Sequence, residues 1–144
     1  MINWFVVAAN DEHSWSIDFF VEDDGTLPVR DWLDQLPDEV RAKVIARIDL
    51  LKESGPALDF PYTSQIEGKL REARLRMGKT RYRILYFFDE SRTGILLHGF
   101  TKNTASVEDA DKRIARNRMA KHEGRRAKKA KPSKPDRTKG KSGK

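Results

Sequence analysis

The 144-residue sequence has no cysteine and only three histidines, and both facts restrict its chemistry. Without cysteine, the chain has no disulfide framework and no thiolate ligand for a structural zinc ion. The three histidines, His13, His98 and His122, are scattered along the chain and match no zinc-binding spacing. We therefore expect neither a metal site nor a bound cofactor.

Long apolar runs are also missing. No stretch approaches the roughly 18 apolar residues that a membrane-spanning helix needs. The opening segment MINWFVVAA is mildly apolar, but it has no basic leader and its apolar run is short, unlike a signal peptide. We expect a cytoplasmic protein that does not associate with a membrane.

The net charge of +7 hides a gradient along the chain. Residues 1–60 have 13 acidic and 5 basic side chains, a balance of −8, whereas residues 61–122 have a balance of +7 and residues 123–144 one of +8. An acidic first part and a basic second part indicate a surface for a polyanion. A purely solubilising charge pattern would look the same.

The first half of the sequence predicts one strand and two helices. Residues 15–21 alternate between apolar and polar side chains, as a half-buried strand does. A short helix is predicted to begin at Pro28, and a longer one after Pro37 to end at Gly55. Residues 56–68 are expected to form a loop. The longer helix has an apolar stripe at helical spacing: Val40, Val44, Ile48 and Leu51.

The second half predicts an antiparallel meander followed by a basic helix. Strands are expected at 70–77, 81–89 and 94–102. They must be antiparallel neighbours, because the turns between them are too short for a parallel crossover. Ser106 is a candidate N-cap for a helix that runs to about Lys121.

One domain is therefore predicted over residues 15–122. Residues 1–14 have no clear period and are assigned to a leader or an extra strand. Residues 123–144 contain no large apolar side chain, so we expect a disordered basic tail.

Four arginines follow the period of two in neighbouring strands. If the hairpin between the strands has the matching register, their side chains form one exposed patch that faces away from the core, with His98 and Lys102 at its border. The arginines expected on this patch are Arg74, Arg76, Arg81 and Arg83.

Such a cluster repels itself unless an anion neutralises it, and arginine binds phosphate with two parallel hydrogen bonds. RNA cleavage also needs a base, an acid and a positive charge near the phosphorane. Lys102 is suited to a base role because neighbouring cations disfavour its charged form, and His98 is the one imidazole in this region. Tyr82 and Tyr86 are candidates for stacking on bases, with core packing as the alternative. A solvated strand face remains the alternative for the arginines.

Three stretches occur in order: GTLPVRDWLDQLPDEVRAKVIARIDLL, LREARLRMGKTRYRILYFFD and GILLHGFTKNT, followed by the basic helix. Over about residues 15–122 they resemble the RelE/HigB-like toxins of type II toxin–antitoxin systems, in particular the phage-type HigB branch. The resemblance implies an α+β fold: a small twisted antiparallel sheet, two N-terminal helices on one face and a C-terminal basic helix.

The resemblance also implies an activity and its residues. It implies a ribosome-dependent mRNA endoribonuclease that inhibits translation by metal-independent attack of a 2′-hydroxyl. Its expected partners are the ribosome, mRNA and a cognate antitoxin of helix-turn-helix type. Arg74, Arg83 and Lys102 match basic positions of the family, whereas Glu72 stands where family members often have a second basic residue.

The candidate residues fall into two groups. The predicted catalytic residues are Arg74, Arg83, Lys102 and His98. The predicted RNA-binding residues are Arg76, Arg81, Tyr82, Tyr86, Lys112, Arg113 and Arg116. The alternatives are a non-catalytic gyrase-type inhibitor of the same fold and an RNA-binding regulatory module.

Overall fold

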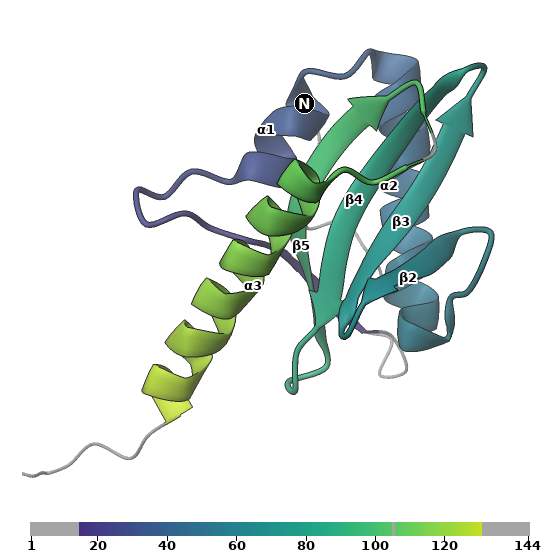
Figure 1. The fold of residues 1–144 in the computed structure, drawn as a ribbon. Helices are drawn as coiled ribbons and strands as arrows, with labels where there is room; N and C mark the ends of the chain where they lie inside the picture. The colour runs from purple at the N-terminus through teal and green to yellow at the C-terminus, as the bar shows by residue number, and fades with distance from the viewer. Residues whose placement is uncertain (1–14, 105, 131–144) are drawn as a thin grey trace, which may run out of the picture.

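The computed structural model describes residues 15–104 and 106–130 and has an α+β fold (Figure 1). Its elements are β1 (Ser16–Phe19), α1 (Pro28–Asp34), α2 (Asp38–Ser54), a short 3₁₀ helix η1 (Gly55–Ala57), β2 (Thr63–Glu67), β3 (Leu70–Met77), β4 (Thr80–Phe88), β5 (Thr93–Lys102) and α3 (Asp109–Ala130). The predicted α+β class is confirmed. No helix of the described residues is long and apolar enough to cross a membrane.

The strands form one mixed sheet in the order β1-β5-β4-β3-β2. The predicted meander of β3, β4 and β5 is antiparallel, but β1 pairs with β5 in parallel, so the prediction of a wholly antiparallel sheet is wrong at this edge. Parallel pairing needs a long crossover connection, which the chain between β1 and β5 supplies. The opposite edge is β2, a strand where a loop was predicted, because its short and mostly polar sequence gives little strand signal.

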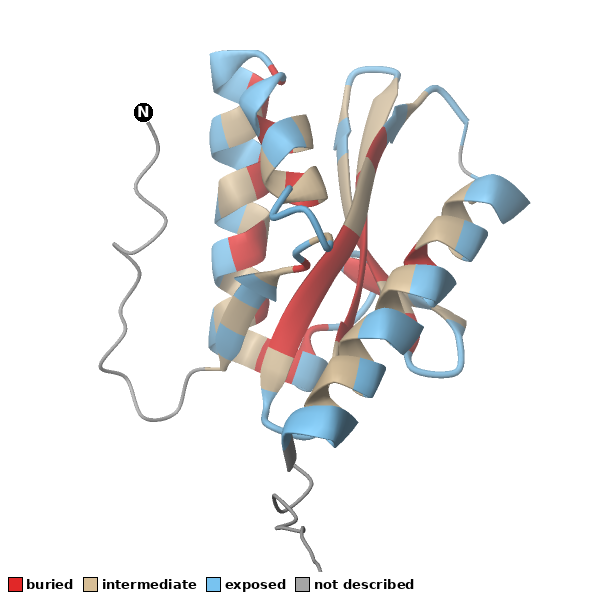
Figure 2. Ribbon diagram, turned by 90° about the vertical axis from the view of Figure 1, so that its left-hand side faces the viewer, coloured by how far each residue is buried: buried red, intermediate tan, exposed pale blue. Residues whose placement is uncertain are grey.

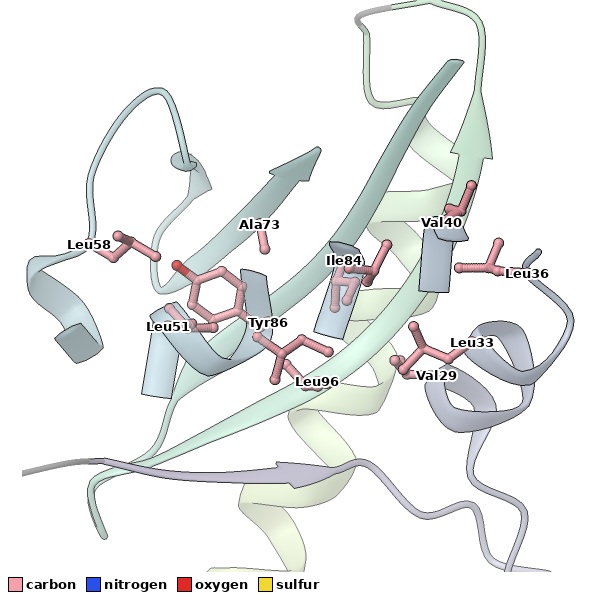
Figure 3. Packing of buried hydrophobic residues seen from close by; sticks show 12 residues of the cluster. Val29, Leu33, Leu36, Val40, Leu51, Leu58, Ala73, Ile84, Tyr86 and Leu96 are labelled. Atoms are coloured by element: carbon pink, nitrogen blue, oxygen red, sulfur yellow. The ribbon is translucent and has the colours of Figure 1, made fainter. Parts of the chain in front are cut away.

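Two apolar clusters lie on opposite faces of the sheet. On one face, α1 and α2 pack against side chains such as Ala73, Ile84, Tyr86 and Leu96 (Figure 3). On the other face, Leu85, Phe87, Ile95 and Leu97 pack with Phe20 and with Ala115 of α3. Figure 2 shows the sheet between α1 and α2 on one side and α3 on the other.

The last helix differs from its predicted bounds. It begins at Asp109 rather than after Ser106, and it continues to Ala130, into the segment that was predicted to be disordered. Contacts with the folded domain hold this extension: Arg125 with Asp23 at 2.7 Å, and Lys69 with Glu123. Residues 1–14 and 131–144, which include the predicted leader and most of the predicted tail, lie outside the described residues.

Ion pairs connect the acidic first half of the chain to the basic last helix. Arg118 contacts Glu22 at 3.0 Å and Lys121 contacts Asp23 at 2.8 Å, both in the segment between β1 and α1. Part of the charge gradient in the sequence is therefore neutralised inside the molecule. It does not all remain for a partner.

Asp89 joins the β4–β5 turn to α3. Its carboxylate accepts hydrogen bonds from the backbone N–H and hydroxyl of Ser91, from the N–H of Thr93 at 3.2 Å and from His122 Nε2 at 2.9 Å. Burial by itself raises the pKa of Asp89, but these hydrogen bonds lower it to about 2. The folded state thus favours the ionised carboxylate.

We predict that Asp89→Asn lowers the free energy of unfolding at pH 7 by about 1–3 kcal/mol, because buried donors lose a charged acceptor. The folded pKa lies below the unfolded one, so this contribution is present above about pH 4 and is lost as the pH falls towards 2. Urea denaturation from pH 7 to pH 2 should show the two proteins converging at low pH. The exposed Glu53→Gln is the control, and a constant difference between wild type and Asp89→Asn would contradict the assignment.

Candidate functional site

The register of the central strands brings the predicted arginines together. Arg74 lies opposite Arg83 and Arg76 opposite Arg81 in the β3–β4 pair, while Arg81 also lies opposite Lys102 of β5. Residues directly opposite in an antiparallel pair point to the same face of the sheet. The predicted pairing of the four arginines is confirmed. We call Arg74, Arg76, Arg81 and Arg83 the arginine cluster.

The arginine cluster lies on the α3 side of the sheet, at the end nearest the β3–β4 hairpin. Farther along β4, Leu85 and Phe87 occupy the same face and form the core beneath α3. One strand face is thus divided in two. The part covered by the helix is apolar, and the part near the hairpin is cationic.

Arg83 is buried, which corrects the prediction that all four arginines are exposed. Only 3% of Arg83 is accessible, and its Nε donates to Glu72 Oε1 at 3.0 Å. Glu72 is also buried, accepts a hydrogen bond from Ser64 Oγ at 2.9 Å and lies 3.9 Å from Arg74. A buried guanidinium is tolerated here because it is paired with a carboxylate.

Burial lowers the pKa of Arg83, while the charge of Glu72 acts in the opposite direction. Arginine nevertheless stays protonated in proteins throughout the physiological pH range. Arg83 is therefore a fixed positive charge, held in one orientation by Glu72. It can stabilise an anion but cannot transfer a proton.

The other members of the arginine cluster are more accessible. Arg76 Nε donates to the Gly78 carbonyl at 2.9 Å, and Arg81 Nη1 donates to the Asn103 carbonyl at 3.0 Å. Within the described residues, neither guanidinium has an acidic partner. These two side chains supply the unneutralised charge of the cluster.

His98 and Lys102 meet at one carboxylate that the sequence reasoning missed. Asp111, in the first turn of α3, contacts His98 Nε2 through Oδ1 at 2.8 Å and Lys102 Nζ through Oδ2 at 3.5 Å. Lys102 also contacts Glu108 at 3.2 Å. In the sequence, Asp111 is recognisable only as an acidic residue at the start of a basic helix. Acidic residues are common there because they interact favourably with the helix dipole, so this position does not indicate a functional site.

The environment of His98 favours its neutral form. Burial lowers the pKa of His98, and Asp111 partly offsets this effect. An ionised carboxylate is an acceptor only, so Nε2 must carry the proton that is shared with Asp111. In the neutral ring, Nδ1 is then an acceptor and has no hydrogen-bond partner among the described residues. His98 also stacks on Phe100, with ring centroids 5.3 Å apart.

The two tyrosines predicted to bind RNA lie on the opposite face of the sheet. Tyr86 is completely buried between β4 and α2, where burial raises its pKa and Arg71 Nε donates to its hydroxyl at 3.4 Å. Tyr82 is partly buried against the same core. The prediction that Tyr86 stacks on a base is wrong, because its position in the period of two turns it into the core with Ile84.

The basic residues of α3 are placed differently from one another. Arg116 forms an ion pair with Glu67 of β2 at 3.0 Å. Arg113 is exposed and Lys112 is partly buried, and neither has an ion-pair partner among the described residues. The structure thus leaves Lys112 and Arg113 as candidates for an external anion and ties Arg116 to the sheet edge.

The chain is a small α+β protein whose central hairpin presents paired arginines on one sheet face. The family described as phage-derived protein Gp49-like (DUF891) matches residues 31–120, and the chain belongs to this family. The matched region contains β2–β5, and with them the whole arginine cluster.

A relative in Mycobacterium tuberculosis, described as "Putative toxin HigB2", is 33% identical over 88 residues. These residues cover 58% of this chain and 44% of the relative, so the chain matches less than half of that protein's length. Together with the family match, this relative confirms the resemblance to the HigB-like toxins that the sequence motifs indicated.

We predict that Glu72→Gln destabilises the protein by about 3 kcal/mol, because it leaves Arg83 buried without a counter-charge. The matched control is Glu67→Gln, which removes an exposed carboxylate from its arginine and should cost less than about 1 kcal/mol. Urea denaturation at pH 7 measures both. Equal effects for the two variants would show that the Arg83–Glu72 pair does not hold this part of the sheet.

Proposed function

We propose that the protein is the toxin of a type II toxin–antitoxin system and that it cleaves mRNA on the ribosome. The observation that carries this proposal is the register that pairs Arg74 with Arg83 and Arg76 with Arg81 on one face. Clustered guanidinium groups suit the phosphates of a nucleic-acid backbone. Membership of the Gp49-like family and the similarity to a protein described as a toxin add support.

The proposed reaction divides its tasks among the cluster and its border. Arg76 and Arg81, which have no acidic partner in the described chain, bind phosphates. Arg83 and Arg74 stabilise the negative charge of the phosphorane. The base role expected for Lys102 passes to His98, because Lys102 contacts the carboxylates of Glu108 and Asp111. His98 Nδ1 accepts the 2′-hydroxyl proton, and Lys102 donates a proton to the leaving 5′-oxygen. The attack forms a 2′,3′-cyclic phosphate and needs no metal ion.

A second candidate is RNA binding without cleavage, which the contacts of the same residues favour. Arg83 is paired with Glu72, and Asp111 engages both His98 and Lys102. A site whose proton-transfer groups stay engaged in this way can grip RNA and leave it intact. A gyrase-type inhibitor is the third possibility, but the cluster gives it no specific support.

The proposed partners follow from the proposed activity. They are the ribosome and mRNA in the cytoplasm, and an antitoxin of helix-turn-helix type that neutralises the toxin. A short adjacent reading frame encoding such a protein is the expected genetic context.

Induction of the protein in bacteria should stop growth and translation, with new mRNA 5′ ends mapping within codons. Arg76→Gln and Arg81→Gln should each reduce cleavage about tenfold or more, because each removes a phosphate contact from a stable fold. The control is Lys43→Gln, which removes one positive charge from an exposed position of α2, on the other side of the sheet. Growth arrest with intact transcripts would support the second or third candidate instead.

The pH dependence tests the role of His98. Its folded pKa lies below the usual 6.5, so the neutral imidazole predominates above that pH and is lost as the pH falls below its folded pKa. Cleavage of mRNA on purified ribosomes should therefore stay constant from about pH 7.5 to 6.5 and decline only at lower pH. His98→Asn should be slow and should lack this decline. An unchanged profile in His98→Asn would remove His98 from proton transfer.

A further inference from the structure

Two exposed aromatic residues lie in a turn next to the arginine cluster. The turn, residues 59–62, connects buried Leu58 to β2, and it exposes 66% of Phe60 and 44% of Tyr62. Among the described residues, the only other large apolar side chain with such exposure is Val21. Exposed aromatic side chains that occur together indicate a binding surface.

The turn is held rigidly at both ends. Leu58 and Thr63 are buried, and the Thr63 hydroxyl donates to the Leu58 carbonyl at 2.6 Å. Asp59 closes the turn, because its side chain accepts from the Phe60 N–H at 2.8 Å and its carbonyl accepts from the Tyr62 N–H at 3.0 Å. The aromatic rings are therefore presented in a preorganised position, which lowers the entropic cost of binding.

Arg74 connects this turn to the arginine cluster. Its guanidinium carbon lies 4.9 Å from the centre of the Phe60 ring, and its backbone N–H donates to the Tyr62 carbonyl at 2.8 Å. Arg47 of α2 lies at the same distance over Tyr62 and donates to the Arg74 carbonyl. The aromatic turn thus extends the cationic surface around the edge of β3.

We propose that Phe60, with Tyr62 beside it, is a stacking platform for an unpaired base of the RNA whose phosphates bind the arginine cluster. The proposal rests on the proposed function and names the residues that grip a base. Proteins hold single strands by combining cationic grooves with aromatic side chains, since every base has a face that can stack. Both rings here are flanked by arginines, a setting that favours an anionic strand over a basic protein segment.

The burial of Tyr86 raises the question of which aromatic side chains can contact a bound strand. A strand bound to the cluster needs aromatic partners on the solvent side of the sheet, and β4 offers its tyrosines to the other side. Phe60 reaches the correct side because it comes from a turn at the sheet edge and contacts Arg74. The base-stacking role therefore moves from the strand to the turn.

The test uses the full chain and purified bacterial ribosomes programmed with an uncleavable 2′-O-methylated mRNA. The three positions of the A-site codon each receive, in turn, the fluorescent base 2-aminopurine or an abasic sugar. Wild type should quench the fluorescence at one or more positions. Phe60→Ala should bind the intact mRNA about tenfold more weakly, lose the quenching, and bind the abasic mRNA as wild type does.

Three further variants make the result specific. Phe60→Trp should restore both affinity and quenching, because it supplies another aromatic face. Tyr62→Ala should show a smaller loss. Val21→Ala removes an exposed apolar side chain from the segment between β1 and α1 and should change neither affinity nor quenching.

The outcomes separate this inference from the proposed function. Normal affinity and quenching in Phe60→Ala, with wild type binding well, would overturn the platform and leave the proposed function standing. An equal loss on intact and abasic mRNA would also overturn it. If wild type itself does not bind programmed ribosomes, both proposals fail. If Phe60→Ala instead loses only its binding to the protein of the adjacent gene, the turn is a protein-docking surface and the platform is refuted.

Discussion

The pairing of β3 with β4 fixes the arrangement of the candidate site, because it places four arginines on one face of a sheet. Adjacent guanidinium groups repel one another. The structure limits this repulsion by pairing the buried Arg83 with the carboxylate of Glu72. The buried pair gives the cluster one fixed charge in a fixed direction. Arg76 and Arg81 have no acidic partner among the described residues, so their charge is available to a ligand. The site thus combines a rigid centre with an accessible border, which suits electrostatic stabilisation of a phosphate.

The charge gradient of the chain serves two purposes that composition alone does not separate. Basic residues of α3 bind acidic residues between β1 and α1, and Asp89 holds both His122 and Arg126. These contacts attach the helix to a sheet face that its thin apolar edge covers only in part. Among the described residues, Arg76 and Arg81 of the hairpin have no acidic partner, and neither do Lys112 and Arg113 of α3. These four side chains keep a positive charge that no acid within the described part of the chain neutralises.

Several elements were predictable from local patterns, and others were not. The apolar stripe of α2 and the alternation in β3–β5 identify those elements because side-chain direction follows the backbone period. The edge strand β2 has a single apolar residue, Ile66, and its pairing with β3 comes from the tertiary fold. Likewise, α3 extends past His122 because ion pairs with the domain stabilise a segment that has no large apolar side chain to bury.

The sequence by itself determined that Arg74 shares a strand face with Arg76, and Arg81 with Arg83, because side chains in a strand alternate with a period of two. That the two pairs share one face of the sheet depends on the register of β3 with β4. The sequence also determined the absence of cysteine chemistry. Only the tertiary structure decided which arginine is buried and which aromatic side chains are exposed. Those properties depend on Glu72, Asp111 and the turn at Phe60, which come from separate parts of the chain. The burial of a side chain depends on the residues that pack against it. These residues come from distant parts of the chain, so the local sequence pattern does not predict them.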